Sequence, residues 1–347
     1  MRADLFDFDL PPELIAQEPA RPRDAARLLV VGERFEERAV RDLPDLLLPG
    51  DLLVLNDTRV LPTRFAGRRG AVPVEVTLVE RAGEGAWWAL ARPGKRLRPG
   101  DPVELAEGLS ATVERKDEEG RVRLGFALDG EELLAVIRAA GSMPLPPYIR
   151  RPRGGDARDR DDYQPVFARR EGAVAAPTAS LHFTPELLAR LAERRVETAF
   201  VTLHVGAGTF APVKALDVRD HRMHAEWYEV PEATAGRVAA TRAAGGRVVA
   251  VGTTPLRALE SAAAEGGAVR PGAAETRLFV TPGHRFRVVD LLLTNFHLPR
   301  STLFMLVAAF SGLERMRAAY AFAIDRRFRF FSYGDACLLE RAGEEAA

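Results

Sequence analysis

Helix-like and strand-like segments alternate between residues 184 and 283, and this order restricts the fold more than any other feature. A helix is predicted over 184–195, with Thr184 as N-cap and Pro185 at the first helical position. The series continues with a buried strand at 196–205, a helix at 231–246, a strand at 247–251, a turn into a helix at 252–265 and a strand at 276–283. Such alternation predicts an α/β fold in which helices layer a sheet.

Residues 65 to 130 have a different sequence pattern. Short segments of alternating apolar and polar residues recur about every ten residues, separated by turn-prone pieces such as "RPGKRLRPGD". This spacing predicts a small all-β barrel or sandwich. A further strand, 51–57, belongs with the α/β part. We therefore predict a layered α/β main domain formed by 1–62 and 150–347, interrupted by a β-barrel insertion at 63–149.

Composition excludes several classes of protein. The 49 Lys and Arg residues balance 49 Asp and Glu residues, so a nucleic acid partner would have to be held by a local patch. One cysteine permits no internal disulfide and no Cys-rich metal site. The N-terminus lacks the apolar run of a signal peptide, and no apolar stretch reaches the roughly 18 residues of a membrane span. We expect a cytoplasmic protein without a membrane partner.

Three of the six histidines fall between Thr202 and Glu226. His204 ends a predicted strand, where α/β sheets usually bind ligands, and Gly206 and Gly208 follow it in a turn. His221, His224 and Glu226 come next, at a spacing that would put the two histidines on one face of a helix. A general base, a structural hydrogen-bonded pair and a metal site are the alternatives. No third ligand is obvious, so no metal is expected.

Polar residues also follow other predicted strands. We predict binding roles for the following residues: Asn56, Asp57 and Arg59 after strand 51–57, Thr253 and Thr254 after strand 247–251, and Asn295 and Arg300 before an apolar helix. Thr253 or Thr254 is predicted as the N-cap of the helix that follows, with Pro255 at its first position. The backbone N–H groups at the start of this helix favour an anion, although helix capping alone gives the same pattern. His297 is either a site residue or a core histidine.

Residues 150–170 hold seven arginines against four aspartates. Pro152 and the glycines beside it predict a loop. Such a loop, with Tyr163 and Phe167, could follow an RNA backbone and stack a base, while a solvated charged surface is the alternative.

Nine motifs occur in order between residues 56 and 339: "NDTRVLPTR", "PLPPYI", "YQPVFA", "VAAPTASLHFT", "TLHVGAGTF", "HRMHAEWYE", "VGTTPLRALES", "LLLTNFHLPRSTLFMLV" and "FRFFSYGDACLL". Together they resemble the S-adenosylmethionine:tRNA ribosyltransferase-isomerase family of queuosine biosynthesis across nearly the whole chain. Pro165, Ser180 and Pro255 depart from the family pattern, and none of them replaces a titratable group. The resemblance also points to Gln164, Thr178 and His182, which lie in its motifs, as substrate-binding residues.

The resemblance implies a reaction. The family transfers the ribosyl group of S-adenosylmethionine to 7-aminomethyl-7-deazaguanine at the tRNA wobble position, giving epoxyqueuosine with release of adenine and methionine. S-adenosylmethionine is then a consumed co-substrate, no cofactor is needed, and we expect a monomer. The resemblance assigns no role to the individual histidines; from the proton transfers that this reaction needs, we predict His204 as the base and His221 or His224 as the acid. A tRNA-binding module without catalysis and a metal-dependent hydrolase are the rival hypotheses, which predict no donor consumption and bound zinc, respectively.

Overall fold

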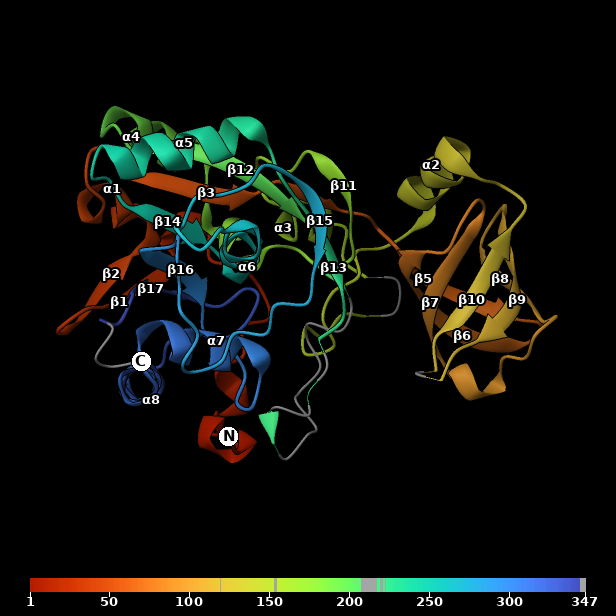
Figure 1. Cartoon of the computed structure of the whole chain (residues 1–347). Helices are drawn as coiled ribbons and strands as arrows, with labels where there is room; N and C mark the ends of the chain where they lie inside the picture. Colours follow the sequence, from red (N-terminus) through yellow and green to blue (C-terminus); the bar gives the residue numbers. More distant parts are fainter. Residues whose placement is uncertain (119, 153–154, 207–216, 219–220, 222, 344–347) are drawn as a thin grey trace. The chain divides into compact units, whose positions relative to one another are not determined.

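The computed structural model describes residues 1–118, 120–152, 155–206, 217–218, 221 and 223–343. The chain divides into two compact units (Figure 1). The first comprises Met1–Thr58, Pro165–Arg170 and Ala176–Ala347, and the second comprises Arg59–Gln164 and Glu171–Ala175. By this division 150–164 group with the inserted unit, whereas the sequence places them in the α/β domain.

The first unit is built on a nine-stranded sheet in the order β15-β13-β12-β3-β14-β16-β17-β1-β2. Its centre, β12-β3-β14-β16, is parallel. Antiparallel pairs flank this centre at β12-β13, β13-β15, β16-β17 and β1-β2. The strands are β1 (Arg27–Val31), β2 (Phe35–Ala39), β3 (Leu52–Asn56), β12 (Glu197–Leu203), β13 (Glu226–Val230), β14 (Val248–Val251), β15 (Gly272–Thr276), β16 (Leu291–Asn295) and β17 (Ala336–Glu340).

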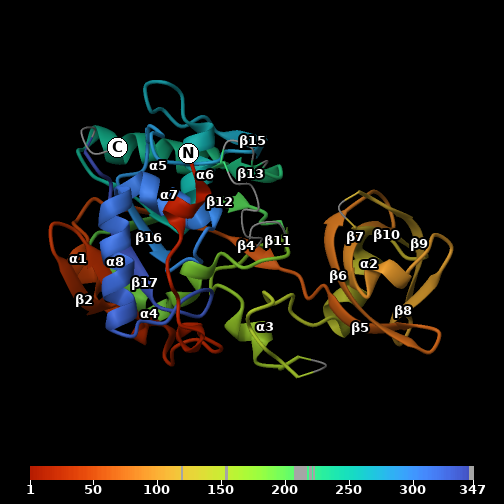
Figure 2. The ribbon, with the colours of Figure 1, turned by 90° about the horizontal axis from the view of Figure 1, so that it is seen from below.

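Helices cover both faces of this sheet. Figure 2 shows α5 and α6 on one side of it and α1 and α4 on the other. The helices of the unit are α1 (Leu43–Leu46), α4 (Pro185–Glu193), α5 (Glu232–Ala243), α6 (Thr253–Ala262), α7 (Thr302–Ser311) and α8 (Leu313–Asp325), and a 3₁₀ turn η6 spans Thr178–His182. The predicted α/β class is confirmed.

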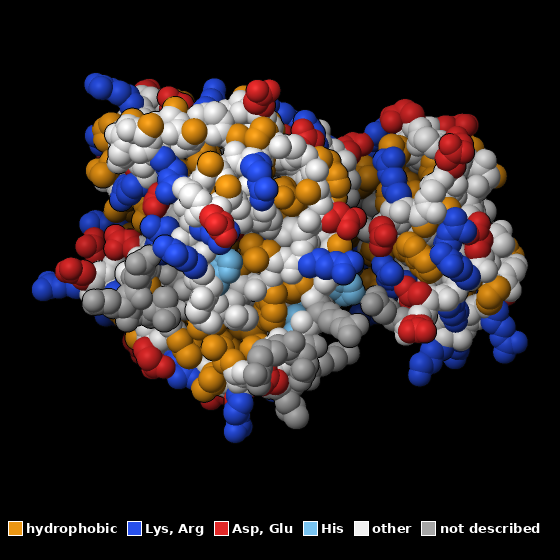
Figure 3. Space-filling view, in the orientation of Figure 1, with side chains coloured by type: hydrophobic (Ala, Val, Ile, Leu, Met, Phe, Trp, Pro, Cys, Tyr) orange, Lys and Arg blue, Asp and Glu red, His pale blue; other side chains and the backbone are white. Residues whose placement is uncertain are grey.

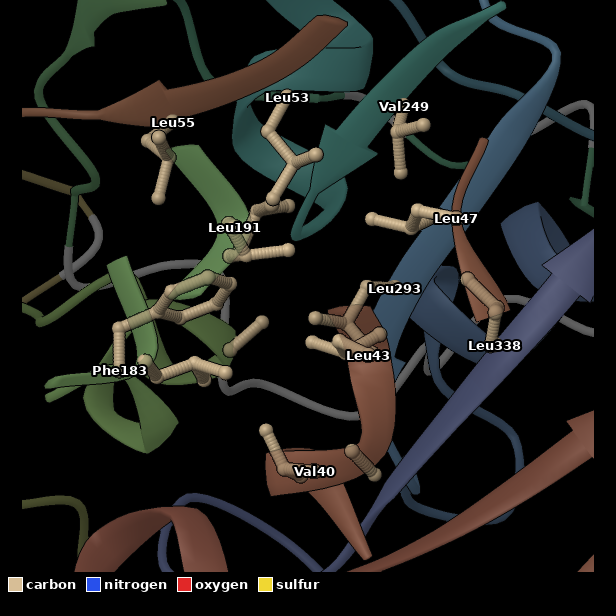
Figure 4. Close-up of a cluster of buried hydrophobic side chains, with 14 of the residues drawn as sticks. Val40, Leu43, Leu47, Leu53, Leu55, Phe183, Leu191, Val249, Leu293 and Leu338 are labelled. Atoms are coloured by element: carbon tan, nitrogen blue, oxygen red, sulfur yellow. The ribbon is translucent and has the colours of Figure 1, made fainter. Parts of the chain in front are cut away.

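One core lies between the sheet and the α1–α4 side (Figure 4). Alternate residues of the central strands point into it, for example Leu53 and Leu55 of β3 and Val249 of β14, where they meet Leu43 and Leu191 of the helices. All five are nearly or fully buried. Because both faces of β3 are covered, all five of its residues are buried, as expected for a central parallel strand.

The second unit is a closed six-stranded barrel, in the order β10-β7-β6-β5-β8-β9. Its elements are β5 (Arg64–Arg69), β6 (Val72–Arg81), β7 (Ala86–Arg92), β8 (Pro102–Ala106), β9 (Leu109–Lys116), β10 (Val122–Phe126), and the helices α2 (Gly130–Ala140) and α3 (Asp159–Asp162). Alternation along the strands fills the interior with apolar side chains, including those of Val76, Val113 and Leu124. The predicted small barrel is confirmed. The short strands β4 (Thr58–Val60) and β11 (Arg170–Ala173) pair where the chain passes from one unit to the other.

Two local predictions were wrong. Residues 277–283 form no strand: β15 ends at Thr276, and the N–H of Leu278 bonds to the Thr276 hydroxyl instead of to a neighbouring strand. Helix α6 begins at Thr253, so Pro255 is its third residue and not its first. Proline is tolerated there because N–H groups of the first helical turn have no partner within the helix. The predicted cap Thr184 is confirmed, since its side chain accepts the N–H of Leu187, and Ser301 caps α7 in the same way.

Candidate active site

The carboxyl ends of β12, β3, β14 and β16 meet at one edge of the sheet because these strands are parallel. A small cavity of about 40 Å³ opens at this edge, lined by η6, by Val205 after β12, by Thr253 and Thr254, and by His297 after β16. Most residues predicted for substrate binding in the α/β unit therefore lie at one place. This edge is the candidate active site.

His204 directly follows β12 and is half-buried. Its Nδ1 lies 2.9 Å from the Thr58 hydroxyl oxygen, and its ring stacks on Trp227 of β13 with centroids 5.1 Å apart and an interplanar angle of 18°. Its backbone N–H donates to the Trp227 carbonyl. The imidazole is thus oriented by a hydroxyl at one edge and an indole on one face.

Asn56, at the end of β3, joins two strand ends. Its amide donates to the Leu203 carbonyl at 2.9 Å and the Thr254 hydroxyl at 3.3 Å, and its Oδ1 accepts the N–H groups of Leu203 and Thr58 at 3.1 Å. Asp57 accepts the Thr202 hydroxyl at 2.7 Å and is buried. The sequence assigned both residues to substrate, whereas the structure uses them to hold β12 and β3 together beside His204.

Glu226 opens β13 and forms a buried ion pair with Arg257 of α6, both side chains being 5% exposed. Its other carboxylate oxygen accepts the N–H of Gly206 at 3.2 Å. Arg257 Nε donates to the Leu278 carbonyl, and its Nη2 has no partner within the described part of the chain. The pair fixes the turn that follows His204. This geometry favours a positioning role for Glu226 over the predicted catalytic role.

The turn between β14 and α6 needs glycine. Gly252 has φ +97°, a left-handed conformation that residues with side chains rarely adopt. Thr253 and Thr254 follow as the first residues of α6 and line the cavity. The helix therefore presents the positive end of its dipole to the site.

Two buried histidines lie at the same edge. His182 Nε2 is 3.3 Å from the amide nitrogen of Asn295, which also donates to the carbonyls of Phe331 and Ser332. Burial lowers the pKa of His182 to about 4 and that of His297 to about 3. Both imidazoles are neutral near pH 7. His297 Nε2 lies 3.0 Å from the Thr294 hydroxyl, so its ring combines a core position with a place on the cavity wall.

The remaining predicted residues of this unit are less central. His221 is half-buried against Phe279, and its pKa is lowered by burial and then by His224, which is exposed. Neither histidine is in a helix, so the shared face that a helix would have given them does not form. Arg300 is half-buried with φ +56°. Gly208 lies outside the described residues. Among the residues that are described, no three His, Cys, Asp or Glu side chains group as a metal site.

Three predicted residues belong to the inserted unit. Arg59 is exposed there. Gln164 exchanges two hydrogen bonds with the backbone of Val60, at 2.9 and 3.0 Å. Tyr163 is fully buried, and Phe167, in the α/β unit, packs against Phe183 and Phe200, so neither ring is presented for stacking a base as the sequence suggested.

The family model described as "Queuosine biosynthesis protein" matches residues 3–339. The chain belongs to this queuosine biosynthesis family. It is 60% identical to the S-adenosylmethionine:tRNA ribosyltransferase-isomerase of Phenylobacterium zucineum, covering 97% of this chain and 99% of that protein, and 59% identical to that of Rhodospirillum rubrum, covering 99% of both. The crystal structure of the S-adenosylmethionine tRNA ribosyltransferase from Thermotoga maritima is 40% identical, with TM-score 0.55, over 96% of this chain and 99% of that one.

The structure also brings to the candidate site residues that the sequence analysis did not single out. Thr58, Trp227 and Arg257 lie in the motifs, but their spacing in the sequence does not indicate a role for them. The structure identifies them by their contacts: Thr58 and Trp227 contact His204, and Arg257 pairs with Glu226. Within the described residues, no helix is long and apolar enough to cross a membrane.

The buried histidines of this queuosine-family chain predict acid sensitivity. Their folded-state pKa values lie below the ordinary value of about 6.5, so the unfolded chain binds more protons below that pH. Stability is full above pH 6.5 and should fall as the pH drops towards 4, by up to about 1.4 kcal/mol per pH unit for each histidine. Urea unfolding between pH 7.5 and 5 measures this slope.

The matched variants are His182→Gln and His297→Gln. Each is expected to remove up to about 1.4 kcal/mol per pH unit of the slope between pH 6.5 and 5, whatever its effect on stability at pH 7.5. Slopes equal to that of the wild type in both variants would contradict the assignment to these histidines.

Proposed function

We propose that this chain transfers the ribosyl group of S-adenosylmethionine to 7-aminomethyl-7-deazaguanine at the wobble position of tRNA, and rearranges it to the epoxycyclopentane of epoxyqueuosine. Adenine and methionine are the leaving products. The observation that carries the proposal is the meeting of an oriented imidazole and a helix N-terminus at the carboxyl edge of the sheet, in a chain of the queuosine biosynthesis family. We further propose that the enzyme works in the cytoplasm, as a monomer and without a resident cofactor.

The chemistry needs a base near the donor sugar. The C5′ hydrogens of S-adenosylmethionine lie beside a sulfonium, and removing one of them begins the transfer of the sugar. A neutral imidazole with a pKa near working pH suits this step. His204 is the histidine whose ring is oriented by two neighbours without full burial. His182 and His297 are too deeply buried to gain a proton readily.

The other groups of the site fit the rest of the donor and the acceptor base. The backbone N–H groups at the start of α6 suit the methionine carboxylate. Departing adenine needs a proton, and the half-buried His221 and exposed His224 are candidates to supply it. Trp227 is 36% exposed beside His204 and offers an aromatic face to a base drawn out of the anticodon loop.

The test is incubation of the purified protein with S-adenosylmethionine and a tRNA that carries 7-aminomethyl-7-deazaguanine. We expect free adenine and methionine in equal amounts, and a nucleoside in the tRNA that is heavier by the transferred sugar. The same tRNA with an unmodified guanine at the wobble position is the matched control and should release neither. Formation of S-adenosylhomocysteine would indicate methyl transfer and overturn the proposal.

A further inference from the structure

A second, larger cavity lies in the α/β unit, at the opposite end of the sheet. Its volume is about 870 Å³. Its walls come from the end of α5, the loop after α6, the loop 283–287 before β16, the end of α7 and the residues after β17. These segments lie at the amino-terminal ends of β14 and β16, whereas the candidate active site lies at their carboxyl ends.

The lining of this cavity is strongly basic. Its lining includes four arginines, Arg242, Arg285, Arg287 and Arg341, and one carboxylate, that of Glu265, while Arg341 also pairs with Asp290 outside the lining. Figure 3 shows Lys and Arg side chains, with some Asp and Glu among them, on the face of this unit that is turned to the viewer. Since the whole chain has a formal net charge of zero, such a local excess of arginine is the kind of patch that an anionic partner requires.

The loop that carries two of these arginines is held firmly. The buried carboxylate of Glu260 accepts the N–H groups of Arg287, Val288 and Val289 at 2.8 to 3.0 Å. Arg242 Nη1 donates to the carbonyls of Arg287 and Gly267 at 2.8 Å. The arginines therefore stand on a fixed backbone, which lowers the entropy lost when a ligand binds.

Gly267 is required for this arrangement. It has φ +77°, and a Cβ there would come within 2.5 Å of the Arg242 guanidinium and 2.8 Å of the Arg287 carbonyl. Any side chain at this position would displace the arginine that links the two loops. The cavity wall therefore depends on glycine at position 267.

The cavity is also lined by an imidazole and by aromatic rings. His284 Nε2 is buried and has no hydrogen-bond partner within the described part of the chain. The His284 ring meets Phe286 edge to face at 4.8 Å, and Phe286 meets Phe310 in the same way at 4.9 Å. Guanidinium groups around an aromatic wall suit a ligand that carries phosphates and bases.

We propose that this arginine-lined cavity binds the phosphodiester backbone of the RNA substrate, at a place separate from the catalytic edge. The inference rests on the proposed function, which supplies RNA as the partner. The five residues of β16, Leu291–Asn295, separate the two sites, and Asp290, which pairs with Arg341, directly precedes them. That length is about 16 Å at 3.3 Å per residue. About five stacked nucleotides of an RNA strand span the same distance, so one RNA can reach both sites.

The test is the salt dependence of tRNA binding, measured by fluorescence anisotropy without S-adenosylmethionine between 50 and 200 mM salt. The variant is Arg285→Gln with Arg287→Gln, both exposed. The matched control is Arg34→Gln with Arg315→Gln, two exposed arginines of the same unit outside the cavity. We expect the first variant to bind tRNA at least about tenfold more weakly, with a log–log salt slope shallower by about 2, and to raise the KM for tRNA in parallel. The control should match the wild type.

Equal slopes for the cavity variant and the control would overturn the proposal. So would saturable calorimetric binding of ADP that the cavity variant loses while its tRNA slope stays that of the wild type, because the cavity would then hold a free nucleotide. Failure of the proposed function has a different signature: the wild type would release no adenine, while the slope comparison could still be made.

Discussion

Replacing His204 by alanine is expected to lower the turnover of S-adenosylmethionine by about 10²-fold or more, the usual contribution of a positioned general base. The tRNA affinity and the folded structure should stay close to those of the wild type, because the ring is only half-buried. Its Nδ1 is engaged by the Thr58 hydroxyl at 2.9 Å, so proton transfer would run through Nε2. Single-turnover adenine release, with tRNA binding measured in parallel, separates the chemical step from substrate binding.

Variants of Thr58 test the same role of His204 through a smaller expected effect. Thr58→Val keeps the shape and removes the hydroxyl, which should slow turnover by a few-fold to about tenfold, the value of one hydrogen bond. Thr58→Ser restores the hydroxyl and should restore most of the rate. If the His204→Ala enzyme were fully active, His204 would have no part in the mechanism. Thr58→Val would then not slow turnover by disturbing His204.

The sequence predicted the elements that depend on local pattern. Strand, glycine turn and helix follow one another at 247–265, and the parallel central strands bring the ends of β3, β12, β14 and β16 together as the predicted α/β class requires. His204 and Thr253 therefore lie at one edge, as their positions after predicted strands indicated, and the structure adds His297 after β16, a strand that was not predicted. The barrel strands were predicted equally well, because buried and exposed side chains alternate along a strand and this alternation is visible in neighbouring residues of the sequence.

What the sequence could not show was which polar groups satisfy one another across the fold. Asn56 looks like a ligand-binding residue until its amide is seen to bond with residues 147 and 198 positions away. Tyr163 looks like an RNA-stacking residue, yet its ring is fully buried. Arg257 is an ordinary helical arginine in sequence, and only the approach of α6 to β13 makes it the partner of Glu226. Such pairings depend on tertiary distance, which no local period encodes.

The Glu226–Arg257 pair leads to the largest expected loss of stability. Glu226→Gln keeps the side-chain volume but leaves the buried Arg257 guanidinium without its counter-charge, and removal of one partner of a buried pair costs about 3–5 kcal/mol. Arg257→Met should cost a similar amount by leaving the Glu226 carboxylate uncompensated. Urea unfolding of both single variants and of the double variant completes the cycle. The double variant should be destabilised by clearly less than the sum of the two, because no lone buried charge remains.

An exposed pair on the same unit supplies the matched comparison. Glu314 and Arg317 on α8 are 3.0 Å apart, with 83% and 37% of their side chains exposed. Glu314→Gln should change the free energy of unfolding by less than about 1 kcal/mol, since water screens the exposed charges. Because Gly206 N–H bonds to the Glu226 carboxylate, the Glu226 variant should also lose turnover under conditions where it remains folded. If Glu226→Gln cost no more than Glu314→Gln and kept full activity, the buried pair would neither hold the fold nor position the turn after His204.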